Sequence, residues 1–154
     1  MRLFKRILLI LLIGFVAIQF FRPRRNIDTA VLSSDIINMV DMPERVSVIL
    51  KNSCYDCHSN NTRYPWYINI QPMGWIMADH IRDGKKDLNF SEFGSYSPRK
   101  QTNKLRAIES SVKSGEMPIS SYTLMHSDAK LSESDKQLIA EWVSAAKDSL
   151  AQKN

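Results

Sequence analysis

Cys54-Tyr55-Asp56-Cys57-His58 contains both cysteines of this 154-residue chain. On a helical turn this spacing presents the two thiols to one side, where they can add to the two vinyl groups of a haem. The histidine that follows can then reach the iron from below the same ring. C-x-x-C-H is the attachment signature of c-type haem. The motif therefore predicts one haem attached covalently through Cys54 and Cys57, with His58 as the proximal iron ligand.

Other interpretations of the two cysteines stay open. A thioredoxin-like redox pair would require a strand–helix context, which this sequence does not show. A structural disulfide would need no histidine after the second cysteine. A zinc site needs four ligands, and the chain could supply them from Cys54, Cys57, His80 and His126.

The second axial ligand of the iron decides between electron transfer and chemistry at an open site. Met117 is the strongest candidate, because it lies in an irregular segment just past a predicted helix end. Pro118 follows it and stiffens the backbone, which limits the entropy lost when the ligand is ordered. His80 and His126 are the alternative ligands, and an open site is the third option.

The surroundings of the haem can also be predicted. The ring N–H of His58 needs an acceptor that fixes the ring plane. We expect this acceptor to be a backbone carbonyl near Pro65 or Pro72. Three aromatic residues are candidates for the haem wall, with core packing as the alternative: Trp66, Tyr67 and Trp75.

The positive charge of the chain is concentrated at its N-terminus. Residues 1–25 carry six basic side chains and no acidic one, which leaves 15 basic and 16 acidic side chains elsewhere. Nucleic-acid binding is therefore not expected. Residues 82–113 form a second basic stripe, with eight basic and four acidic side chains. It could pair with haem propionates or an acidic partner, or be a solvated helix face.

Residues 7–21 are almost wholly apolar and lie between basic flanks, as in a secretory signal. Bulky residues at 19–23 leave no small-residue cleavage site, so we expect residues 1–25 to be an uncleaved transmembrane signal-anchor. Leu3 and Phe4 extend the apolar run close to the minimum length for a span, while Lys5 and Arg6 snorkel. Since c-type haem is attached outside the cytoplasm, we expect a single-pass protein of the bacterial cytoplasmic membrane with its haem domain in the periplasm.

The apolar spacings are helical and sustained alternation is absent, which predicts an all-α chain. We expect a tether over residues 26–40 and the haem-binding domain over 41–150. A first helix should begin at Asp41, where Pro43 and Glu44 complete a capping-box pattern. A second should span about 72–83, with Gly84 as its C-terminal cap. One face of this second helix carries Met73, Ile76, Met77, His80 and Ile81.

Two further helices have clear local signals. The third opens at Ser97-Pro98, since proline is favoured at the first helical position, and Gly115 ends it. The last starts at Ser132, with Asp135 in capping-box register.

Residues 54–67, CYDCHSNNTRYPWY, resemble the bacterial haem-binding domain family of small C-x-x-C-H proteins. The similarity continues through 88–93 and 115–118 to Tyr122, His126, residues 131–132 and Trp142, and covers roughly 40–145. This resemblance implies a cytochrome c-like domain that transfers electrons outside the cytoplasm. In some relatives it accompanies cytochrome c or dihaem peroxidase modules. Met117 as sixth ligand is supported by analogy with the Met-Pro segment of ordinary cytochromes c.

The leading hypothesis is therefore a one-electron carrier and not an enzyme, tethered near a redox protein partner that the sequence does not identify. The second hypothesis is a five-coordinate haem peroxidase or sensor, in which His80 or His126 would act on the distal side. The third is a zinc-binding interaction module.

Overall fold

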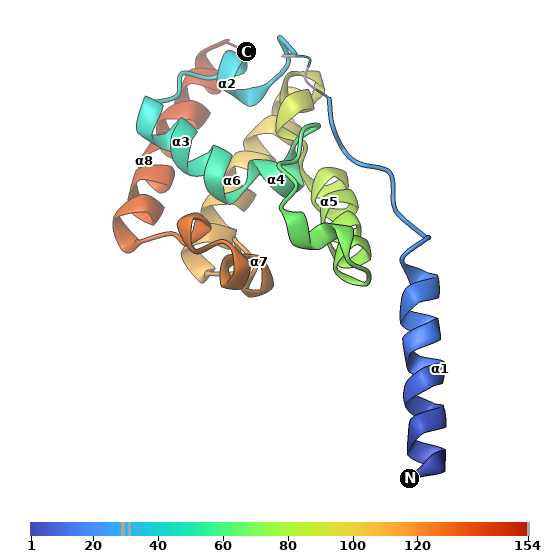
Figure 1. Cartoon of the computed structure of the whole chain (residues 1–154). Helices are drawn as coiled ribbons and strands as arrows, with labels where there is room; N and C mark the ends of the chain where they lie inside the picture. Colours follow the sequence, from blue (N-terminus) through green and yellow to red (C-terminus); the bar gives the residue numbers. More distant parts are fainter. Residues whose placement is uncertain (29, 31, 154) are drawn as a thin grey trace.

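The computed structural model describes residues 1–28, 30 and 32–153. The all-α prediction is confirmed, because these residues form helices and no strand, apart from an isolated bridge between Ile27 and Asn61. Figure 1 shows a helical body with one helix projecting from it. The α-helices are α1 (Arg2–Ile18), α2 (Ile36–Met39), α3 (Glu44–Ser53), α4 (Tyr55–His58), α5 (Met73–Asp87), α6 (Pro98–Ser114), α7 (Ser120–Met125) and α8 (Glu133–Lys153), and the 3-10 helices are η1 (Trp66–Asn69), η2 (Phe90–Ser95) and η3 (Ser127–Ala129).

Three helix ends predicted from local signals are correct: both ends of α6 and the start of α8. Pro98 begins α6, and Gly115 follows its last residue with a left-handed φ of 76°. At the start of α8 the backbone N–H of Ser132 donates to the Asp135 carboxylate, and the N–H of Asp135 donates to the Ser132 hydroxyl, at 3.1 and 3.2 Å. The predicted capping box is therefore formed.

Two predicted helix ends are wrong. The first helix begins at Glu44 and not at Asp41, because Pro43 disfavours helical backbone at Met42 and itself has an extended conformation. The second helix does not end before Gly84 but continues to Asp87.

The main core lies where α6 packs along α8. Leu105 and Val112 of α6 and Ile139 and Val143 of α8 are almost fully buried. Burying each such side chain contributes about 1.5–3 kcal/mol relative to leaving it exposed. A second, smaller cluster lies between η1, α5 and α7 and contains Ile68, Met77, Ile81, Tyr122 and Ala129.

The described residues of 26–40, the segment that we expected to serve as a tether, hold extensive contacts with the body. Ile36 and Val40 belong to the main core. Asp35 caps α2 and also accepts a hydrogen bond from the hydroxyl of Tyr55, within the cysteine motif, at 2.7 Å. This segment therefore supports the motif directly.

The N-terminal helix α1 projects away from the body (Figure 1), and its side chains are exposed or half-exposed. Among the residues that the structure describes, no helix is both long and apolar enough to cross a membrane. The structure thus gives no support to the transmembrane signal-anchor expected over residues 1–25.

Candidate haem site

The cysteine motif lies at the junction of α3 and α4. Cys54 follows the last residue of α3, and its carbonyl accepts hydrogen bonds from the backbone N–H groups of Cys57 and His58 at 3.2 and 3.0 Å. This single turn places the two sulfur atoms and the imidazole on one side of the backbone. Both cysteines are free thiols.

All three residues border one cavity of about 310 Å³ whose exposed lining is largely apolar. A second cavity of about 80 Å³ adjoins it, since Cys54, His58 and Met117 line both. The larger cavity is walled by α5 and by the segment before and within α7. The smaller one is walled by α6 and η2. The predicted attachment residues are therefore brought together around a space between four parts of the fold.

The imidazole of His58 is oriented by the backbone carbonyl of Leu88, 3.0 Å from its Nδ1. A carbonyl oxygen only accepts hydrogen bonds, so Nδ1 carries the proton and the lone pair of the ring is on Nε2. This is the tautomer that a metal-bound histidine needs. The predicted acceptor near Pro65 or Pro72 is wrong, because the chain after α5 and not the loop after the motif passes beside the ring.

Gly84 allows α5 to approach the motif closely. A Cβ atom added at Gly84 would lie 2.7 Å from the carbonyl oxygen and 3.3 Å from the Cβ of Cys57. Only glycine permits this close approach, because the opposing atoms of Cys57 are backbone atoms and the Cβ bonded to the backbone. The glycine that we expected to cap the helix therefore serves tertiary packing inside it.

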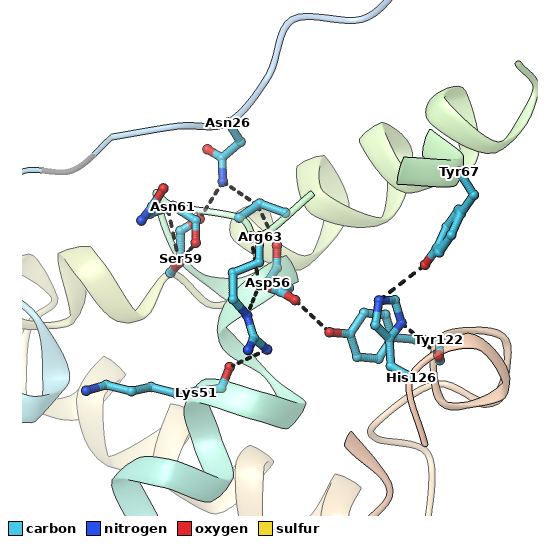
Figure 2. A network of polar contacts seen from close by, with 10 residues as sticks. Asn26, Lys51, Asp56, Ser59, Asn61, Arg63, Tyr67, Tyr122 and His126 are labelled. Carbon is cyan, nitrogen blue, oxygen red and sulfur yellow. Dashed lines mark hydrogen bonds and ion pairs between the residues drawn. The ribbon is translucent and has the colours of Figure 1, made fainter. Parts of the chain in front are cut away.

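Asp56, the residue before the second cysteine, is buried and fully engaged (Figure 2). One carboxylate oxygen accepts from the backbone N–H of Arg63 at 3.0 Å, and the other accepts from the hydroxyl of Tyr122 at 2.7 Å. Its carbonyl accepts from the hydroxyl of Thr62 at 2.6 Å. Burial, followed by the hydrogen bond to Asp56, raises the pKa of Tyr122, so the hydroxyl stays protonated and donates. The motif is thereby joined to both the following loop and α7.

The thiols are held in their neutral form. Burial, with the nearby Cys57, raises the pKa of Cys54 to about 12, and burial, with the nearby Asp56, raises that of Cys57 to about 11. Reactive redox cysteines instead have lowered pKa values, near 7 in thioredoxin. The chemistry of these thiols does not match a thioredoxin-like pair.

Met117 and His80 border the same cavity as His58, whereas His126 is not among its lining residues. The Nδ1 of His126 lies 3.1 Å from the carbonyl oxygen of Tyr122, and its Nε2 lies 3.2 Å from the hydroxyl of Tyr67 (Figure 2). Both ring nitrogens are therefore engaged. Of the three candidates for the second axial position, the geometry brings two to the motif.

Comparison with known families gives one result. The model of the family described as the haem-binding domain matches residues 13–145. The chain belongs to this haem-binding domain family. No match was found among the curated proteins or among the solved structures. Haem binding is thus established at the level of the family, and the residues around the cavity fit it.

The three aromatic residues predicted as candidates for the haem wall lie away from the cavities at the motif. Trp66 is 75% exposed, and the indole N–H of Trp75 donates to the carbonyl of Phe21 at 2.6 Å. Tyr67 lines a separate hollow on the other side of His80. None of the three, which lie in η1 and the first turn of α5, is among the residues that line the two cavities at the motif.

Sequence reasoning missed much of the apolar lining that the haem-binding domain does provide. Phe90 packs near the His58 ring, with centroids 6.0 Å apart. Lys104, which belongs to the basic stripe of residues 82–113, lines the smaller cavity and pairs with Asp87 at 2.8 Å. Helical periodicity marks apolar residues as buried but cannot tell a cavity wall from the core beside it. The other apolar lining residues are Leu88, Ile108, Val112 and Ile119.

The zinc alternative finds no support. Within the described part of the chain, no group of three or more His, Cys, Asp or Glu side chains lies close enough to hold a metal ion. The four ligands considered for zinc include His126, which Tyr67 and Tyr122 engage instead.

Proposed function

We propose that this haem-binding domain is a monohaem c-type cytochrome that carries single electrons outside the cytoplasm. One observation carries the proposal: two free thiols and a histidine with its lone pair on Nε2 border the same cavity. The haem supplies the redox chemistry, while the protein sets the ligands, the polarity and the exposure of the haem edge.

Cys54 and Cys57 would hold the haem by thioether bonds. In each, the sulfur bonds to one vinyl carbon and the thiol hydrogen goes to the other, so nothing leaves. His58 would be the proximal ligand, and Leu88 would keep its ring in the required tautomer.

Met117 would be the distal ligand, because it borders both cavities beside His58. A thioether ligand raises the reduction potential and fills the coordination sphere, which suits electron transfer. His80 borders the same cavity, and it supports a second candidate function: a five-coordinate haem, with His80 available for acid–base chemistry in a peroxidase or sensor.

Residues 1–25 would attach the chain to the bacterial cytoplasmic membrane, with the haem domain in the periplasm. The apolar run of residues 7–21 and the basic residues on both sides of that run support this attachment. Attachment would raise the effective concentration of the domain near membrane redox partners.

The first experiment expresses the full chain with and without the c-haem maturation system. We expect one haem that stays attached after acid–acetone extraction, and its complete loss from the chain in Cys54→Ser/Cys57→Ser. A chain that binds haem only reversibly would contradict covalent attachment.

The second experiment identifies the distal ligand. The ferric spectrum should show a thioether charge-transfer band that Met117→Ala removes and His80→Gln leaves intact. Rapid, tight binding of CO or cyanide by the unaltered protein would instead indicate the five-coordinate candidate.

A further inference from the structure

Apolar side chains lie exposed on η1, the turn after it, the first turn of α5, and α7. Trp66 and Met125 are 75% and 50% exposed. A grouped apolar surface of this kind marks an interaction site. We call the following residues the apolar platform: Trp66, Met73, Ile76 and Met125.

The platform is continuous between α5 and α7. Met73, Ile76 and Met125 line one hollow of about 60 Å³. Tyr67 lines the same hollow and contacts Trp66 edge to face, with ring centroids 6.1 Å apart. Trp66, Met73, Ile76 and Met125, which come from η1, α5 and α7, therefore form a single surface.

The C-terminal end of α1 is fixed beside this platform. The side chain of Gln19 accepts from the backbone N–H of Gln71 at 2.8 Å and donates to its carbonyl at 3.2 Å. Trp75 donates to the carbonyl of Phe21 at 2.6 Å. In Figure 1, α1 points away from the body on the side where the start of α5 and α7 lie. These hydrogen bonds therefore fix the position of the C-terminal end of α1 relative to the platform.

Basic side chains surround this junction. Arg22, Arg24 and Arg25 line a hollow of about 110 Å³ against η1 and α5, and none of the described residues that line it is acidic. Arg25 donates to the side chain of Asn69 at 2.9 Å and lies over the ring of Tyr64, 5.4 Å from its centroid. Basic residues directly after an apolar segment favour anionic lipid headgroups.

We propose that the apolar platform rests on a lipid bilayer with anionic headgroups and, together with the inserted α1, fixes the orientation of the haem-binding body. The arginines would lie at the level of the phosphates. His80 and Tyr122 line both the platform hollow and the haem cavity, so the cavity would be held close to the lipid surface. The inference rests on the proposed function, because it requires a loaded haem and a membrane-attached chain.

The test uses the haem-loaded full chain in oriented bilayers that contain phosphatidylcholine and phosphatidylglycerol. Linear dichroism of the Soret band reports the angle of the haem plane to the membrane. We expect clear dichroism for the unaltered chain and its loss in Trp66→Glu/Met125→Glu, where two exposed apolar side chains of the platform become charged. The matched control is Val48→Glu on α3, which is 51% exposed and lies outside the platform. It should keep the dichroism.

Vesicle flotation and the optical spectrum accompany each sample. A double variant that floats with vesicles, keeps its spectrum and keeps full dichroism would overturn the inference, as would equal loss in the control. A concentration-dependent dimer of the unaltered chain, abolished by the double variant, would assign the platform to a second copy and also overturn it. Absence of covalent haem or of flotation in the unaltered chain would instead overturn the proposed function.

Discussion

Individual residues around the motif have partners that allow single interactions to be tested. Tyr122→Phe removes the hydroxyl that donates to the buried Asp56 carboxylate while keeping the ring. A buried acceptor that loses its donor costs about 1–3 kcal/mol. We expect the free energy of unfolding of the loaded protein, measured by urea denaturation, to fall by about that amount. Tyr67→Phe removes a hydroxyl whose partner is the half-buried His126, and it should cost clearly less.

Gly84 gives a second test at this scale. Gly84→Ala places a methyl group against the carbonyl of Cys57, so α5 must shift away from the motif. Overpacking of this kind costs about 1–3 kcal/mol, and we expect lower stability and less covalent haem per chain. Gly14→Ala in α1 meets no atom within 4 Å and serves as the control. Equal haem loading in Gly84→Ala and the unaltered chain would show that the close approach is not needed.

The same residues show how far a sequence can be interpreted. Cys54, Cys57 and His58 are recognisable because their chemistry depends on spacing along the chain, and the structure brings Met117 to the same cavity. Leu88 is not recognisable, because any residue supplies a backbone carbonyl and only the path of the chain brings this one to His58. The family of the chain could thus be predicted from its motifs, whereas the backbone carbonyl that orients the His58 ring could not.

At the scale of elements, the capping box at the start of α8 should make the stability of the protein depend on pH. Hydrogen bonds from Ser132 lower the pKa of Asp135 from its ordinary value of 3.8. The stability this carboxylate contributes is therefore present above pH 3.8 and is lost as the pH falls through the lowered pKa of the folded state. Ser132→Ala should cost about 0.5–2 kcal/mol at neutral pH. In acid titrations followed by circular dichroism, the difference between variant and unaltered chain should shrink below that pH. A constant difference would contradict this cause.

Elements were predicted well where their ends depend on neighbouring residues and poorly where tertiary packing decides. Pro98, Gly115 and Ser132 act within one turn, so α6 begins and ends as expected and α8 begins as expected. Met73 and Ile76 share the predicted apolar face of α5 with Met77 and Ile81, yet the first two are exposed and the last two are buried. Periodicity defines an apolar face but does not show that another element covers it.

For the whole molecule, the arrangement of the two clusters around the motif has a consequence for folding. Ile108 and Val112 belong to the main core and line the smaller cavity, while Ile119 and Tyr122 belong to the second cluster and line the larger one. Across this space the two clusters cannot make apolar contacts with each other. A haem bound there would make apolar contacts with both clusters. The second cluster is small and includes the short helix α7, so it depends on that filling more than the core of α6 and α8 does.

We therefore expect haem loading to order the part of the fold that carries Met117. In Cys54→Ser/Cys57→Ser, which cannot retain a covalent haem, amide hydrogen exchange over residues 117–126 should accelerate by at least about tenfold relative to the loaded chain. Exchange in the buried turns of α6 and α8 should change much less, because the contacts of Leu105 with this core persist without haem. Exchange measured by mass spectrometry on both proteins distinguishes the two regions. Uniform acceleration across the body would show instead that the clusters unfold as one unit.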